Sequence, residues 1–112
     1  MEKSVEHKLA SKERYLAQEA KAYEMLRSSN LYDFINSLRY AYSFCLRYRK
    51  NLRDFIEDAT FINPFIEVIK DGETKTPLDK CLKCGILKPW NNTYWFDKEK
   101  AASLQQYILE HN

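Results

Sequence analysis

The chain has 112 residues, of which 45% are hydrophobic, 14% aromatic and 30% charged. A chain of this length forms one domain that buries roughly 65% of its unfolded surface, which suffices for a core without disulfides. Only two glycines and three prolines are present, which argues against a loop-rich chain and disfavours an all-β fold. The formal net charge of +2 is too small to attract nucleic acid or a membrane through a long-range field, so any binding electrostatics must be local.

The cysteine content predicts a reducing compartment. Three cysteines cannot all pair within one chain, and we identify no signal peptide and no transmembrane run of about 18 apolar residues. We therefore expect a cytoplasmic protein with no membrane partner. Cys45 lies within an apolar helical pattern, which predicts a small buried hydrophobic residue.

The first half of the chain has the periodicity of two long helices. Apolar residues in segment 3–29 recur at intervals of three, four and seven, and residues 28–30 can each cap a following helix. From Leu31 the apolar spacing continues in steps of three or four to Ala59, which predicts a second helix of about eight turns. These helices should pack antiparallel as an αα-hairpin over residues 3–59. The predicted stripe of the first helix is Val5, Leu9, Leu16, Ala20, Tyr23 and Leu26.

The second half, residues 60–112, has a different character. Pro64 is followed by a β-rich run and then by Asp71-Gly72, a strong hairpin signal. We expect a small antiparallel sheet of two or three strands between about Phe65 and Phe96. Asp97 is a candidate N-cap for a short terminal helix, whose apolar positions are Ala101, Leu104 and Ile108. The expected fold is helix-dominated α+β: one domain, residues 1–112, comprising a helical hairpin, a small β element with a candidate zinc knuckle, and a closing helix.

The segment CLKCGILKPW, residues 81–90, is the clearest candidate for chemistry. Cys81 and Cys84 are separated by two residues and followed by Gly85, as in a zinc knuckle, but a structural zinc ion usually takes four protein ligands. A metal-free turn is the competing interpretation. A redox dithiol is disfavoured, because Gly85 and Pro89 follow where such a motif needs a helix.

Residues 81–96, CLKCGILKPWNNTYWF, resemble the first half of the treble-clef zinc segments of small phage and mobile-element proteins, including those that precede HNH nuclease domains. The resemblance implies a zinc cofactor held by Cys81, Cys84 and a second pair of ligands near the start of the following helix. No second cysteine pair occurs there, so Asp97, His111 or cysteines of another subunit would have to complete the site. Nuclease activity is not expected, because the two histidines lie near opposite ends of the chain.

Segment 34–53, FINSLRYAYSFCLRYRKNLR, contains five basic residues, five aromatic residues and no acidic residue. On a helix, these bases and tyrosines could dock a protein partner or bind the phosphates and bases of nucleic acid. They could equally pair with acidic residues of the first helix, such as Glu13, Glu19 and Glu24, and form only a solvated surface. The candidate partner-binding residues are Arg39, Tyr40, Arg47, Arg49, Lys50 and Arg53.

We therefore expect a small non-enzymatic accessory or regulatory protein, of phage or mobile-element type, that binds and modulates a larger protein or nucleoprotein machine. A nucleic-acid-binding protein with a degenerate zinc-ribbon-like knuckle is one alternative. A structural homodimer is another, because two long helices can bury surplus aromatic rings between copies. The surplus rings are Tyr32, Tyr40, Tyr42, Phe44 and Tyr48.

Overall fold

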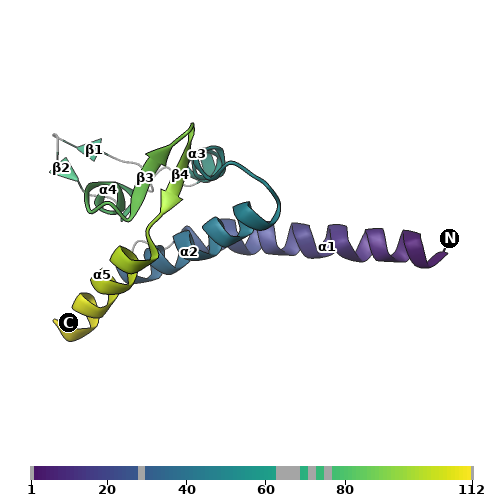
Figure 1. Cartoon of the computed structure of the whole chain (residues 1–112), viewed down its shortest axis with the longest axis horizontal. Coiled ribbons are helices and arrows are strands. Elements are labelled where there is room, and N and C mark those ends of the chain that lie inside the picture. The colour runs from purple at the N-terminus through teal and green to yellow at the C-terminus, as the bar shows by residue number, and fades with distance from the viewer. Residues whose placement is uncertain (1, 28–29, 63–68, 71–72, 75–76, 112) are drawn as a thin grey trace.

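The computed structural model describes residues 2–27, 30–62, 69–70, 73–74 and 77–111. These residues form five helices and four short strands, a helix-dominated α+β arrangement as expected. None of the helices in these ranges is both long enough and apolar enough to cross a membrane. In chain order (Figure 1) the elements are α1 (Glu2–Met25), α2 (Leu31–Arg47), α3 (Leu52–Ile62), β1 (Ile69–Lys70), β2 (Glu73–Thr74), α4 (Pro77–Lys83), β3 (Leu87–Trp90), β4 (Thr93–Phe96) and α5 (Lys98–Glu110).

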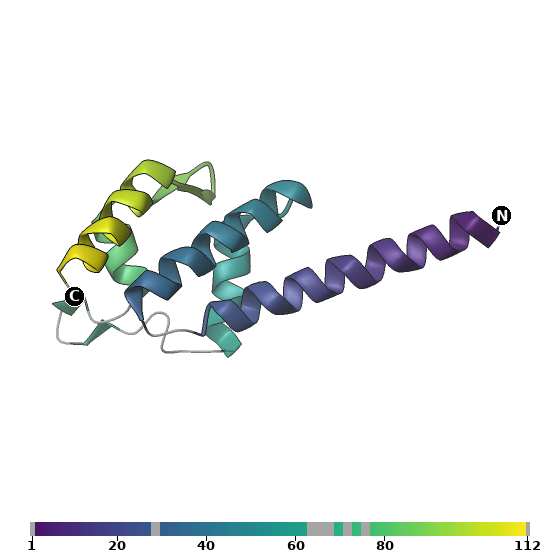
Figure 2. The same ribbon diagram turned by 90° about the horizontal axis from the view of Figure 1, so that it is seen from below.

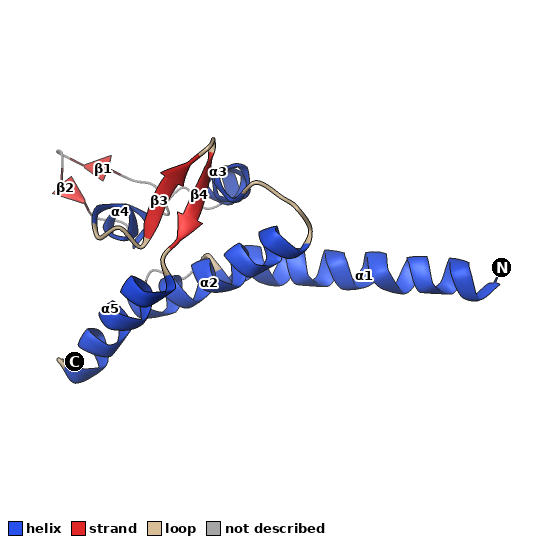
Figure 3. Ribbon diagram, in the orientation of Figure 1, coloured by secondary structure: helices blue, strands red, loops and turns tan. Residues whose placement is uncertain are grey.

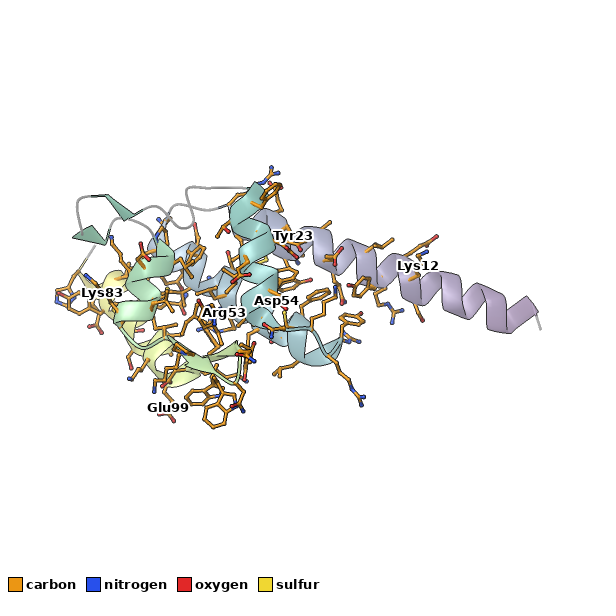
Figure 4. The ribbon with its side chains drawn as sticks, turned by 90° about the horizontal axis from the view of Figure 1, so that it is seen from above. Lys12, Tyr23, Arg53, Asp54, Lys83 and Glu99 are labelled. Atoms are coloured by element: carbon orange, nitrogen blue, oxygen red, sulfur yellow. The ribbon has the colours of Figure 1, made fainter. Side chains whose placement is uncertain are left out.

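Helices α1 and α2 form the predicted helical hairpin. Asn30 caps α2, because its side-chain Oδ1 accepts a hydrogen bond from the backbone N–H of Asp33 at 3.2 Å. Ala22 and Leu26 of α1 are fully buried. Toward its N-terminus, α1 diverges from α2 and extends past the rest of the chain (Figure 2), and Lys12 lies on this projecting part (Figure 4).

The buried side of α1 differs from the predicted stripe. Leu16 is 48% exposed and Ala20 is also exposed, so the stripe is wrong at these two positions. Tyr15 packs inward instead, with its ring centroid 5.5 Å from that of Phe44 and 4.9 Å from that of Tyr48. The stripe is confirmed at Tyr23 and Leu26, which pack against the core. Tyr15, a half-buried tyrosine, takes the contact position that the aliphatic Leu16 was expected to fill. The side chains of Val5 and Leu9 lie outside the described part of α1.

The predicted helix 31–59 is in fact two helices, and its continuity is a wrong prediction. Arg49 has a φ of 55°, and the N–H of Lys50 donates to the carbonyl of Cys45 at 2.8 Å, which is the hydrogen bond of a Schellman C-cap. Asn51 then starts α3, since its Oδ1 accepts from the N–H of Asp54 at 3.0 Å. The apolar periodicity runs through this reversal because both helices direct their stripes into the same core.

Helix α3 folds back over α1 and completes the core. The ring of Phe55 stacks on that of Tyr23 at a centroid distance of 4.4 Å, where α1 and α3 meet (Figure 4). Cys45 is buried as predicted, with 3% of its surface exposed. Of the rings expected to be in surplus, Phe44 is buried and Tyr40, Tyr42 and Tyr48 pack partly against the same core.

The strands form two separate antiparallel pairs. β1 pairs with β2, and the predicted Asp71-Gly72 turn between them lies outside the described residues. β3 pairs with β4, with Leu87 opposite Phe96 and Trp90 opposite Thr93. The two residues between them, Asn91 and Asn92, have φ values of 45° and 66°, as a type I′ turn requires. This second hairpin lies between α3 and α4 (Figure 3).

Helix α4 was not expected from the sequence, where residues 77–83 were included in the sheet region. Helix α5 was expected, and Asp97 caps it by accepting a hydrogen bond from the N–H of Lys100 at 3.0 Å.

A buried glutamine joins α5 to α2. The side-chain amide of Gln105 donates to the Tyr32 carbonyl and to Asn36 Oδ1, and its Oε1 accepts from Arg39 at 2.8 Å.

The strained residue of the α2 C-cap gives a stability prediction. A side chain at positive φ costs roughly 1 kcal/mol, so Arg49→Gly should be more stable than Arg49→Ala by about 0.5–1 kcal/mol. Both substitutions remove the same charge, so the difference isolates the backbone term. Urea unfolding of the two variants measures it, and an alanine variant at least as stable as the glycine variant would show that the reversal is not held in this conformation.

Candidate functional site: a tryptophan surface beside the α2–α3 turn

The six predicted partner-binding residues do not form one patch. Arg39 is half-buried between α2 and α5, where its guanidinium donates to Asn36 Oδ1 at 2.7 Å as well as to Gln105. Arg53 is exposed on α3 and pairs with Glu57 at 3.6 Å. These two arginines lie on different elements and make contacts within the chain, so they do not extend a single basic stripe.

Tyr40 and Arg47 lie on the side of α2 that faces α1. The ammonium of Lys21 is 5.2 Å from the centroid of the Tyr40 ring, and the guanidinium of Arg47 is 5.8 Å from the centroid of Tyr48. A small hollow of about 110 Å³ lies between the two helices and is lined by Gln18, Tyr40, Ser43, Phe44 and Arg47.

Arg49 and Lys50 lie in the turn between α2 and α3. Lys50 Nζ is 3.3 Å from a carboxylate oxygen of Glu19 and 5.0 Å from the centroid of the Tyr15 ring. Hydrogen bonding to Tyr15, and then to Glu19, raises the pKa of Lys50, so its ammonium stays charged. Arg49 is exposed, and no ion pair to it is found among the described residues.

The most exposed cluster of large apolar side chains in this region lies beside that turn and was not predicted. Leu46 on α2 is 63% exposed, and Trp90 and Trp95 on the β3–β4 hairpin are 65% and 47% exposed. Tyr42, Leu46 and Trp95 line two adjoining hollows, and Trp90 lines one of them. We call Tyr42, Leu46, Trp90 and Trp95 the tryptophan surface.

Strand register explains why the two tryptophans share one side of the hairpin. Lys88 is opposite Trp95 and Trp90 is opposite Thr93, so Trp90 and Trp95 are diagonal neighbours in a sheet whose side chains alternate. On the other side, Leu87 and Phe96 are buried in the core. Burial of that pair therefore directs both tryptophans outward.

Two lysines border the tryptophan surface. Lys50 lines one hollow together with Leu46, Trp90 and Trp95. Lys88 Nζ lies 5.3 Å from the centroid of the Trp95 ring, within cation–π range, and 3.5 Å from a carboxylate oxygen of Asp97. The backbone N–H of Lys100 and the nearby Lys88 lower the pKa of Asp97, which is therefore an anion at neutral pH.

The cysteine pair forms the end of a helix. The N–H of Gly85 donates to the carbonyl of Leu82 at 3.3 Å and the N–H of Ile86 donates to that of Cys81 at 2.9 Å, which is a complete Schellman motif. Gly85 has a φ of 79°, the left-handed conformation that this motif requires. Cys81 and Ile86 are both fully buried, which gives the apolar contact that often accompanies it.

Within one chain, the described residues do not form a complete zinc site. Cys81 is fully buried in the apolar core, and burial raises the pKa of its thiol to about 12, so zinc binding would have to displace a proton that this environment favours. Asp97 is occupied as the cap of α5, and His111 stacks on Tyr107 at 4.1 Å. Within the ranges that the structure describes, no three histidine, cysteine, aspartate or glutamate residues gather as metal ligands.

Comparison of the chain with protein families, with curated proteins and with solved structures finds no match. The tryptophan surface is therefore the feature of this chain from which a function can be inferred. Its signal was present in the sequence, because Trp90 and Trp95 are the only tryptophans and flank Asn91-Asn92, a pair that suits a two-residue hairpin turn.

Quenching of tryptophan fluorescence tests the geometry of this surface. Since Trp90 and Trp95 are the only tryptophans, all of the tryptophan emission comes from it. We expect strong quenching in water, and a ratio of iodide to caesium quenching higher than that of free N-acetyltryptophanamide, because Lys50 and Lys88 attract the anion. The Lys88→Gln variant should lower this ratio, whereas a ratio in the unmodified protein no higher than that of the free indole would contradict the described positions of the lysines.

Thiol reactivity tests the role of the cysteines. Burial raises the pKa of Cys45 to about 11 and that of Cys81 to about 12, while Cys84 is exposed. At about pH 8 we expect one thiol to react with Ellman's reagent in the folded protein, none rapidly in Cys84→Ser, and all three after unfolding. The purified protein should also carry much less than one equivalent of zinc. Stoichiometric zinc that protects Cys84 from reaction would support the knuckle instead.

Proposed function

We propose that this protein is a small non-enzymatic accessory or regulatory protein that acts by binding a larger protein through the tryptophan surface. The observation that carries the proposal is the clustering of Leu46, Trp90 and Trp95, each about half exposed or more, on two elements that meet. Tryptophan and tyrosine dominate the binding energy of protein interfaces, since a rigid ring buries a large area at little entropic cost.

The surroundings of the tryptophans support a built binding surface. The hairpin that carries them is fixed at its tip, because the Asn51 side chain donates to the carbonyl of Asn92 at 2.9 Å and Thr93 Oγ1 accepts from the N–H of Leu52 at 3.0 Å. A surface held by such bonds loses little freedom when a partner binds. Arg49 and Lys50 flank the tryptophan surface and would contribute positive charge to partner binding. Arg39 would not contribute, because it joins α2 to α5 through Gln105.

Nucleic acid is the second candidate partner. The observation that favours it is the position of the Lys88 ammonium over the Trp95 ring. Proteins that bind single strands combine positive charge with exposed aromatic rings on which the bases stack. A homodimer through the same surface is a third. It would bring Lys50 and Lys88 of one copy toward those of the other, which is electrostatically unfavourable.

Photo-crosslinking in the source cell tests the proposal. Leu46 is replaced by p-benzoylphenylalanine, and a matched control carries it at Leu109, which is 60% exposed on α5. We expect position 46, but not position 109, to give a discrete adduct with a larger protein. Trp90→Ala introduced into the position-46 protein should remove most of that adduct, because it truncates an exposed ring without opening the core.

The mass and composition of the adduct separate the candidates. A nuclease-sensitive adduct at position 46 would replace the proposal by nucleic-acid binding, and an adduct of twice the chain mass would replace it by a homodimer. Equal adducts at positions 46 and 109, or an adduct unaffected by Trp90→Ala, would overturn the assignment of this surface.

A further inference from the structure

We infer that the partner binds through a segment that lies in the trough between α2 and the β3–β4 hairpin. The bulky apolar side chains of this segment are flanked by carboxylates, and these carboxylates lie at the Lys50 end. The inference rests on the proposed function and adds the chemistry of the partner. It follows from the shape of the surface, from the hydrogen bonding of the strands and from the distribution of charge.

The shape is that of a trough with an apolar floor. One hollow, of about 260 Å³, extends toward Trp90 and Lys50, and the other, of about 450 Å³, extends toward the N-terminus of α5. Both are lined by Tyr42, Leu46 and Trp95, so they are continuous across these side chains. Tyr42, Leu46 and Lys50 are spaced four residues apart, and the first two form one ridge of α2. A trough of this form suits a row of side chains from an elongated segment.

The strands favour contact through side chains over addition of a new strand. Trp90 and Thr93 flank a two-residue turn, so their backbone groups face each other across the hairpin. The alternation then turns the backbone of Pro89 toward the outer edge of β3, where proline has no N–H to donate. Strand addition at β3 would therefore lose a hydrogen bond, and affinity must come from the tryptophan surface.

The charges differ between the two ends of the trough. Lys50, which also pairs with Glu19, lines one end. The exposed Arg49 is next to it in the chain and adds a positive charge for which no ion pair is found among the described residues. Asp97, Lys98 and Glu99 line the other end, and Glu99 is close to the hairpin (Figure 4). A nucleic-acid backbone, negative along its whole length, would meet carboxylates at the second end. A protein segment that is acidic only at the Lys50 end is complementary to both ends of the trough.

Selection of peptides from a random phage-displayed library tests the inference. The native protein is the target, and a Trp90→Ala/Trp95→Ala protein removes clones that bind elsewhere. Because both rings are exposed, this double variant should fold, as circular dichroism can verify. We expect the retained peptides to combine aromatic or aliphatic residues with an excess of aspartate and glutamate.

Charge reversal then locates the acidic end. The affinity of a retained synthetic peptide is measured from the tryptophan emission, which should shift to the blue as the rings lose contact with water. Lys50→Glu should weaken binding at least tenfold, which corresponds to about 1.4 kcal/mol. Because Lys50 also pairs with Glu19, circular dichroism and urea unfolding must first show that this variant keeps its fold. Lys83→Glu, on the exposed side of α4 (Figure 4), should change the affinity less than twofold.

The possible outcomes separate this inference from the proposed function. Retained peptides that are neutral or basic, or that bind Lys50→Glu as well as the native protein, would overturn the inference and leave protein binding intact. A library that yields no clone dependent on Trp90 and Trp95 would overturn both. Saturable binding of a single-stranded oligo-dT that is lost in the double variant would overturn the inference in favour of nucleic acid.

Discussion

The rest of the structure depends on the reversal of the chain at residues 48–51. Arg49 in the left-handed conformation ends α2, and Asn51 starts α3 one residue after the Schellman bond of Lys50. Asn51 has a second role, because its amide also donates to the carbonyl of Asn92 in the hairpin turn. One side chain thus fixes the start of a helix and the tip of a hairpin that is 41 residues away in sequence. Without this reversal, a single long helix would carry Phe55 and Ile56 away from α1.

The same reversal creates the candidate site. It brings the β3–β4 hairpin beside the C-terminal part of α2, where Leu46 is left uncovered and Trp90 and Trp95 line a hollow with it. It also sets Lys50 against Glu19 and Tyr15 of α1. Basic residues that looked equivalent along one predicted helix therefore have different environments. Arg39 is held by Gln105 across the α2–α5 contact, whereas Arg49 projects from the turn.

The cysteine motif shows how one spacing can serve two purposes. A zinc knuckle and a Schellman cap both favour glycine after the second cysteine, because both need a residue at positive φ. Spacing alone cannot separate them, but burial can. Cys81 points into the core beside Ile86, and its raised pKa keeps the thiol protonated, while Cys84 is exposed at the helix end. The buried Cys81 thus contributes to packing, and the exposed Cys84 lies where the Schellman motif ends α4.

The sequence by itself determined the helix-dominated class, the helical hairpin, the cap at Asp97 and the burial of Cys45, because these follow from local hydrogen bonding and from apolar periodicity. It offered residues 28–30 as caps for the second helix, and the structure selects Asn30. It did not determine the break at Arg49, since the apolar stripe continues across it. Nor did it determine which rings stay exposed. Phe44 and Trp95 are both large aromatic residues, and only the packing of α1, α3 and the hairpin against α2 decided that one is buried and the other faces water. Burial is a property of non-local contacts, so only the tertiary structure shows that these tryptophans lie together on the surface.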